Sequence, residues 1–127
     1  MPPAGLRVEA LRGAITLDTD SREEVLVRTA QMLGELLQRN DLQPDDIISM
    51  LFTATADITS EFPAAAVRKA GISDVPMVRA RELGIVGESN IPLCIRVMAH
   101  VYTERPRAAL RHAYLRGARQ LRSDLPE

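Results

Sequence analysis

Cysteine and aromatic residues are scarce in this chain of 127 residues. The single cysteine, Cys94, has no partner for an intrachain disulfide, and only two histidines accompany it, too few for a typical structural zinc site. The chain has two Phe, two Tyr and no Trp, so it offers few platforms on which nucleic-acid bases can stack. These shortages predict a reduced, cytoplasmic protein and disfavour a disulfide scaffold, a metal centre and a single-strand-binding module.

An excess of charge of one sign is also missing. The chain has 16 basic and 17 acidic residues, a formal net charge of −1, so no overall field would attract nucleic acid or an anionic membrane. No segment approaches the ~20 apolar residues of a membrane span, and residues 1–30 lack the unbroken apolar stretch of a signal peptide. We therefore expect neither nucleic acid nor a membrane as a partner.

The composition that is present is typical of a globular domain, with 46% apolar and 26% charged residues. This length favours one domain, and a chain of this size can bury about two thirds of its surface, enough for a core without disulfides or metal. Residues 1–6 are interpreted as a flexible leader.

The clearest predicted element is a helix that begins after Ser21. Ser21 and Glu24 have the spacing of a capping box, and Leu26, Ala30, Leu33 and Leu37 then fall on one helical stripe. Asn40 is the expected end of the helix.

Strands are predicted at 7–17, 47–56, 75–79, 93–103 and 113–121, with short helices at 64–70 and 106–112. In 93–103 apolar side chains alternate with a second set that includes Arg96. This order of elements predicts an α+β domain in which helices cover one side of a mixed β-sheet.

Two arginines, Arg12 and Arg96, lie in the middle of strands that are otherwise mostly apolar or small. Burying a guanidinium group is costly unless an anion pairs with it. Either both strand faces are open to solvent, or the two arginines converge on a small polyanion such as a dicarboxylate. Arg68 and Arg122 are candidates for further cationic contacts, and Glu82 for a balancing acid.

Other chemistries find less support. Gly84 and Gly87 are not followed by the helix that a phosphate loop requires, and no nucleophile elbow occurs. Cys94 is interpreted as a small strand residue and His112 as a helix-surface or capping residue. The arginine-rich run 105–122 is interpreted as a solvated face, with a nucleic-acid-binding module as the less favoured alternative.

Five segments, in this order and spacing, resemble the AroH-class chorismate mutases, which are small, monofunctional, trimeric enzymes. They are LRGAITL (11–17), TATADITSEFPAAAVR (53–68), VPMVRARE (75–82), CIRVMAHVYT (94–103) and RHAYLRGARQLRSDL (111–125). The resemblance implies one chorismate mutase domain over residues 7–125. It also implies an isomerase that converts chorismate into prephenate by a [3,3]-sigmatropic rearrangement in phenylalanine and tyrosine biosynthesis, with no cofactor and no metal.

The resemblance further implies a fold related to the ferredoxin-like folds and a homotrimer arranged as a pseudo-α/β barrel. Active sites are expected in the clefts between neighbouring subunits. Arg12 is expected to bind a substrate carboxylate, Arg96 the ether oxygen of the bond that breaks, and Glu82 to lie near the substrate hydroxyl and the positively polarised ring; these three are the expected catalytic residues. The expected substrate-binding residues are Tyr114, which binds a carboxylate; Phe62, Ala64 and Arg68 from the adjacent subunit; Arg79; and Leu121 and Arg122, which close the site.

The chain departs from the family pattern at two positions. Ala65 stands where many members have lysine, and Arg79 where many have Cys or Ser. We hypothesise that Arg79 or Arg122 supplies the missing positive charge. Because a fold does not determine function, a non-catalytic trimer that binds a small anionic metabolite on the same scaffold remains the alternative to a mutase.

Overall fold

The computed structural model describes residues 5–87 and 91–122, which form one five-stranded sheet in the order β3-β2-β4-β1-β5. Residues 1–4 of the predicted leader and 123–125 of the predicted domain lie outside the described residues. The strands are β1 (Arg7–Thr16), β2 (Ile47–Ala54), β3 (Met77–Arg81), β4 (Cys94–Thr103) and β5 (Ala113–Leu115). The helices are α1 (Arg22–Arg39) and α2 (Ala64–Lys69), with 3-10 helices η1 (Pro44–Asp46), η2 (Arg107–Ala109) and η3 (Arg116–Arg122).

The sheet is mixed, as predicted. Strand β4 runs antiparallel to both β1 and β2, whereas the β1–β5 and β2–β3 pairs are parallel. Together with the helices packed on it, this sheet confirms the α+β fold class. None of the helices over the described ranges has the length and apolar character needed to cross a bilayer.

Helix α1 begins where the capping box predicts. The Glu24 amide donates to Ser21 Oγ over 3.1 Å, which satisfies one of the free amides of the first turn. The buried stripe differs slightly from the prediction, because Ala30 is exposed and Thr29 is buried in its place. The buried residues of α1 are Val25, Leu26, Thr29, Met32, Leu33 and Leu36.

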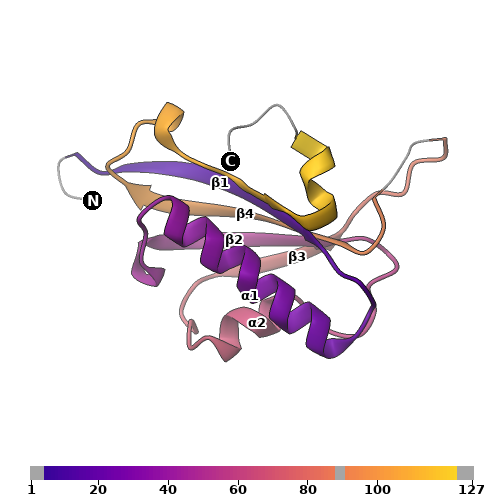
Figure 1. Ribbon diagram of the computed structural model, residues 1–127. Coiled ribbons are helices and arrows are strands. Elements are labelled where there is room, and N and C mark those ends of the chain that lie inside the picture. The colour runs from indigo at the N-terminus through magenta and orange to yellow at the C-terminus, as the bar shows by residue number, and fades with distance from the viewer. Residues whose placement is uncertain (1–4, 88–90, 123–127) are drawn as a thin grey trace.

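Helices α1 and α2 lie against one face of the sheet (Figure 1), and the main core lies between them and that face. The predicted alternation holds through the middle of β1 and β4: Leu11 and Ile15 of β1 and Ile95 and Val97 of β4 are buried, while Arg12 and Arg96 are exposed on the opposite face. At one end of that opposite face Ala14 and Cys94 are buried in a small cluster with Ala118 of η3. We call that opposite side of the sheet the open face.

The expected strand at 113–121 is wrong beyond Leu115. Arg116 has a left-handed backbone with φ of 56°, which ends the strand, and its guanidinium forms an ion pair with Asp18. The chain then turns into η3, where the Gly117 amide donates to Thr16 Oγ1 over 2.9 Å. A Cβ atom at Gly117 would lie 2.9 Å from the same oxygen, so the close approach requires glycine. Helix η3 therefore covers one end of the open face.

Other boundaries also differ from prediction, and the strand expected at 47–56 ends at Ala54. The expected helix at 106–112 is only the single turn η2, and the expected strand at 75–79 is β3, two residues later. Parallel pairing with β2 sets the position of β3, since Met77 lies opposite Met50 and Arg81 opposite Ala54. The Glu82 amide then donates to the Ala54 carbonyl over 3.0 Å, which fixes Glu82 at the end of β2.

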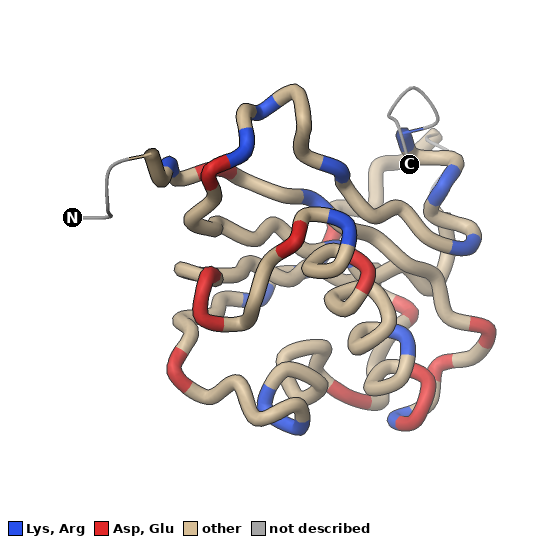
Figure 2. Tube along the Cα trace, turned by 60° about the vertical axis from the view of Figure 1, so that its left-hand side comes forward, with Lys and Arg blue, Asp and Glu red and all other residues tan. Residues whose placement is uncertain are grey.

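The arginines of the run 105–122 are largely occupied within the fold. Arg105 donates to the Arg39 carbonyl over 3.0 Å, and Arg107 pairs with Glu9 over 3.2 Å. Basic and acidic residues are interspersed along the described trace (Figure 2). This use of the arginines favours the interpretation of the run as a solvated face over a nucleic-acid-binding surface.

Candidate active site

One row of side chains crosses the open face. Arg96 of β4 lies opposite Thr53 of β2 on one side and Ala14 of β1 on the other, and Ala14 lies opposite Tyr114 of β5. Residues that are directly opposite on one face of a sheet have neighbouring side chains. Because Thr53 and Ala14 are small, they leave room around the Arg96 guanidinium.

The next row brings Arg12 beside this group. Arg12 lies opposite Met98, two residues beyond Arg96 on β4, so both arginines point to the same side of the sheet. A cavity of about 280 Å³ joins the two rows. The predicted site residues that line it are Arg12, Arg96, Tyr114, Leu121 and Arg122. Strands β1, β2 and β4 and the continuous segment β5–η3 thus meet at one cavity.

Glu82 contacts Arg96 directly. Arg96 Nε lies 3.4 Å from Glu82 Oε1, and the Thr53 hydroxyl donates a hydrogen bond to the same carboxylate oxygen. The two side chains retain 45% and 26% of their exposure, so the pair is open to a ligand. Arg96 and Glu82 also line a second cavity of about 340 Å³ beside the first. The guanidinium therefore lies between two spaces, with the carboxylate at one side.

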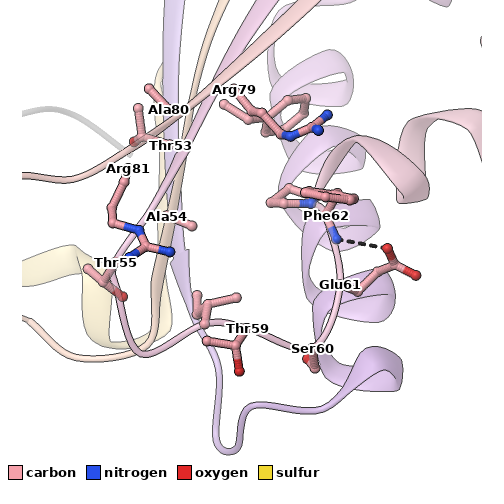
Figure 3. A pocket seen from close by; sticks show the side chains of 13 residues that line it. Thr53, Ala54, Thr55, Thr59, Ser60, Glu61, Phe62, Arg79, Ala80 and Arg81 are labelled. Carbon is pink, nitrogen blue, oxygen red and sulfur yellow. Dashed lines mark hydrogen bonds between the residues drawn. The ribbon is translucent and has the colours of Figure 1, made fainter.

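Phe62 and Arg79 lie together at a different cavity (Figure 3). Arg79 Cζ is 3.8 Å from the centroid of the Phe62 ring, which is the geometry of a cation–π contact. The Glu61 carboxylate accepts the Phe62 amide over 2.8 Å. This cavity measures about 520 Å³, and Thr53 lines both it and the cavity that holds Arg96.

Helix α2 carries the remaining predicted site residues, Ala64 and Arg68. Ala64 is buried in the main core, and Arg68 is exposed in the last turn of α2. Neither is among the described residues that line the cavity of Arg12 and Arg96. One chain thus presents the predicted residues as two sets, one on the open face and one around Phe62 and α2.

Asp20 holds the segment that leads to Phe62. Its carboxylate accepts four hydrogen bonds, from the amides and hydroxyls of Thr59 and Ser60, at 2.7 to 3.1 Å. The side-chain hydrogen bonds from Ser60 and then Thr59 lower the pKa of Asp20. Sequence reasoning missed this clamp because its partners lie about 40 residues away and form no local pattern.

The two other candidates for chemistry are placed differently. Cys94 is buried, and burial raises the pKa of its thiol, which suits a core residue and not a nucleophile. The interpretation of His112 as a helix-surface or capping residue is wrong. Its half-buried ring lies just before β5, and its Nδ1 accepts the Arg12 amide over 2.9 Å. Across 5–87 and 91–122, no group of three or more His, Cys, Asp or Glu side chains could hold a metal ion.

Comparison with known proteins identifies the scaffold. The family model described as chorismate mutase type I matches residues 8–125. The chain belongs to the chorismate mutase type I family. The matched range includes every residue that lines the open-face cavity. Membership in this family favours a mutase over a non-catalytic metabolite binder.

Individual chorismate mutases are similar over nearly the full length. Chorismate mutase AroH of Bacillus subtilis is 38% identical over 121 residues, which cover 94% of each chain. Chorismate mutase AroH of Thermus thermophilus is 40% identical over 119 residues, which cover 93% of this chain and 96% of that protein. The structure of a chorismate mutase from Clostridium thermocellum has a TM-score of 0.84 at 37% identity and covers 88% of this chain and 98% of the other.

Proposed function

We propose that this chorismate mutase converts chorismate into prephenate in the cavity between Arg12, Arg96 and Tyr114. The observation that carries the proposal is the placement of Arg96. Its guanidinium projects from the central strand into a cavity that also holds Arg12 and Tyr114, and it contacts the Glu82 carboxylate at 3.4 Å. A dianionic ether with a developing positive ring matches this distribution of charge.

Arg96 acts on the bond that breaks. In the rearrangement the carbon–oxygen bond lengthens, and negative charge builds on the ether oxygen while positive charge builds on the ring. A guanidinium fixed beside that oxygen stabilises the transition state more than the bound substrate, which is the requirement for catalysis. The carboxylate of Glu82 lies on the side where the ring carries positive charge.

Arg12 and Tyr114 orient the substrate. Chorismate has two carboxylates, and a guanidinium and a phenol are suitable donors to them. Holding both carboxylates selects the compact conformer from which the new bond forms, so part of the barrier is met by binding. Leu121 and Arg122 on η3 close one end of the cavity. No step transfers a proton or forms a bond to the protein.

The open face supports a homotrimer in which each site is completed by a neighbour. Val8, Leu51 and Val78 project from this face with 55%, 39% and 66% of their surface exposed. Such apolar exposure across one sheet face is typical of a surface that meets another subunit. The set around Phe62, Ala64 and Arg68 would then join the cavity of the adjacent chain, with Arg79 stacked on Phe62.

The activity is tested by following the loss of chorismate absorbance when purified protein is added. We expect turnover without added metal, no effect of a chelator, and a kcat that changes little with pH around neutrality, since no group changes protonation in the reaction. A bell-shaped kcat profile centred near pH 7, or an absolute metal requirement, would contradict this mechanism.

Shared sites are tested by mixing two impaired variants and assaying them at a chorismate concentration well below the KM of the Arg68→Ala variant. Arg96→Ala removes a residue of the open-face set, and Arg68→Ala removes one of the α2 set. If each site takes one set from each of two chains, mixed trimers regain some intact sites, and activity rises above that of either variant alone. If one chain supplied both sets, mixing would restore nothing.

The trimer itself is tested by light scattering, which should give a molar mass three times the 14.0 kDa mass of the chain.

The proposed location is the cytoplasm. The one cysteine is a free, buried thiol, which is typical of proteins that fold in a reducing compartment. Fractionation of source cells with a cytoplasmic marker enzyme tests this location.

A further inference from the structure

The segment that leads into β5 is held firmly by the end of α1. Asn40 is 1% exposed, and its side-chain amide donates to the carbonyls of Leu36 and Arg111 over 2.7 and 2.8 Å. Its side-chain oxygen accepts the Arg111 amide over 2.8 Å. A buried side chain with every polar atom paired is a rigid support.

His112 follows directly and connects this support to the active site. Its carbonyl accepts from Arg39 Nη1 over 2.9 Å, and its ring Nδ1 accepts the backbone amide of Arg12 over 2.9 Å. The first residue pair between β1 and β5 is Gly13 with Ala113. The imidazole therefore supplies the acceptor for the Arg12 amide at the point where the ladder with β5 begins.

We propose that His112 is a positioning residue for Arg12, and that its Nδ1 fixes the backbone from which the Arg12 guanidinium enters the substrate cavity. The inference rests on the proposed function, in which Arg12 binds a substrate carboxylate. His112 touches no reacting atom in this scheme. It acts by holding the backbone of β1 at Arg12 in place relative to the other strands that line the cavity. The Arg12 side chain then extends into the cavity from a fixed backbone position.

The contact requires a neutral ring. Nδ1 accepts a hydrogen bond only when it carries no proton, which places the proton of the neutral imidazole on Nε2. Burial lowers the pKa of His112, and the charges of Arg12 on β1 and Arg122 on η3 lower it further. From α1, Arg39 contacts the His112 carbonyl and is itself paired with Glu35 over 2.9 Å. These surroundings keep the ring neutral at neutral pH.

Acidification should therefore weaken substrate binding before it affects the chemistry. Because the pKa of His112 lies below its ordinary value, the hydrogen bond is present at neutral pH and is lost as pH falls through that lowered pKa. The protonated ring offers a donor to the Arg12 amide, which is also a donor. Since Arg12 holds a carboxylate equally in the bound substrate and the transition state, the expected effect is a rise in KM with kcat nearly unchanged.

Two variants at one position test the proposal. His112→Leu removes the acceptor, and we expect KM for chorismate to rise about tenfold at neutral pH, the effect of leaving one backbone amide unpaired. His112→Asn places a non-titrating amide oxygen near the position of Nδ1. We expect it to restore KM to within about threefold of wild type and to abolish the rise in KM on the acid side of neutrality.

The outcomes separate this proposal from the function on which it rests. An inactive wild-type protein, or an Arg12→Ala variant with unchanged KM, would contradict the assigned function. If the wild type is active but the rise in KM on the acid side of neutrality persists in His112→Asn, the positioning role of His112 is wrong while the proposed function stands. A folded His112→Leu variant with the KM of the wild type would have the same consequence. If His112→Leu fails to fold, the pH comparison between wild type and His112→Asn decides. The Arg12 amide resonance should also titrate with His112 in the wild type and not in His112→Asn, a readout that needs no activity.

Discussion

The two faces of the single sheet differ in what their side chains do. On the covered face, Leu11, Ile15 and Ile95 are fully buried and hold α1 to the strands. On the open face, residues adjacent to these in the same strands are Arg12 and Arg96, and both line the proposed site. Successive side chains in a strand point to opposite faces of the sheet. Neighbouring residues can therefore serve either the stability of the core or the proposed catalysis. Substitutions at adjacent positions should therefore have unlike consequences.

The largest effect is expected at Arg96. Arg96→Ala removes the donor proposed to contact the ether oxygen and should lower kcat about 10² to 10³-fold. Its unfolding free energy should change by less than about 1 kcal/mol, because the Arg96–Glu82 pair is partly exposed. Steady-state kinetics and denaturant unfolding measure the two quantities. Arg107→Ala, which removes an exposed arginine paired with the buried Glu9 carboxylate, is the control and should keep full turnover.

The adjacent residue should behave in the opposite way. Ile95→Ala leaves a cavity under a fully buried side chain and should lower the free energy of unfolding by about 2–5 kcal/mol. At a temperature where the variant remains folded, its kcat should stay within a few-fold of wild type. A variant that loses turnover as severely as Arg96→Ala while remaining folded would contradict the separation of the two faces.

Smaller effects are expected from the second set of site residues. Arg68→Ala and Arg79→Ala should each raise KM about tenfold, the contribution of one charge-assisted hydrogen bond, and change kcat little. Arg79→Ala with unchanged substrate affinity would exclude Arg79 as the replacement for the lysine absent at Ala65. Arg22→Ala, an exposed arginine paired with Glu61, removes equal charge from the same region and is the control.

The smallest effect is expected at the Asp20 clamp and depends on pH. The lowered pKa of Asp20 means that its carboxylate stabilises the fold above its ordinary value near 3.8 and ceases to do so as pH falls through the lowered pKa. Asp20→Ala should therefore lower Tm by a few degrees at most at neutral pH, and the difference should shrink in acid. A difference in Tm that is constant with pH would exclude the carboxylate charge as its cause.

The sequence predicted local patterns well and long-range geometry poorly. The capping box at Ser21 and the alternation around Arg96 depend only on near neighbours, so the start of α1 and the two faces of β4 were predictable. The end of β5 was not, because it depends on the left-handed Arg116 and on a contact between Gly117 and Thr16, about 100 residues apart. The same limit explains why local patterns predict a helix surface for His112 and miss its contact with the Arg12 amide.

The candidate site shows the same division. That Arg12 and Arg96 are unusual for their strands was visible in the residues themselves, whereas their shared cavity follows from the antiparallel register of β1 and β4, which periodicity does not give. Family resemblance supplied the other site residues. The direct contact of Glu82 with Arg96 depends on β3 pairing parallel to β2, a register that no local signal in 75–82 encodes.

The hydrogen-bonded ladder between β1 and β4 fixes the distance between the backbone positions of Arg12 and Arg96, because those strands cannot separate without losing their hydrogen bonds. The floor of the proposed substrate cavity therefore has a fixed width. Its adjustable boundaries are the turn of η3 and the segment after Glu82. Adapting this scaffold to a bulkier dianion would require exchange of those two boundaries, with the strands left untouched.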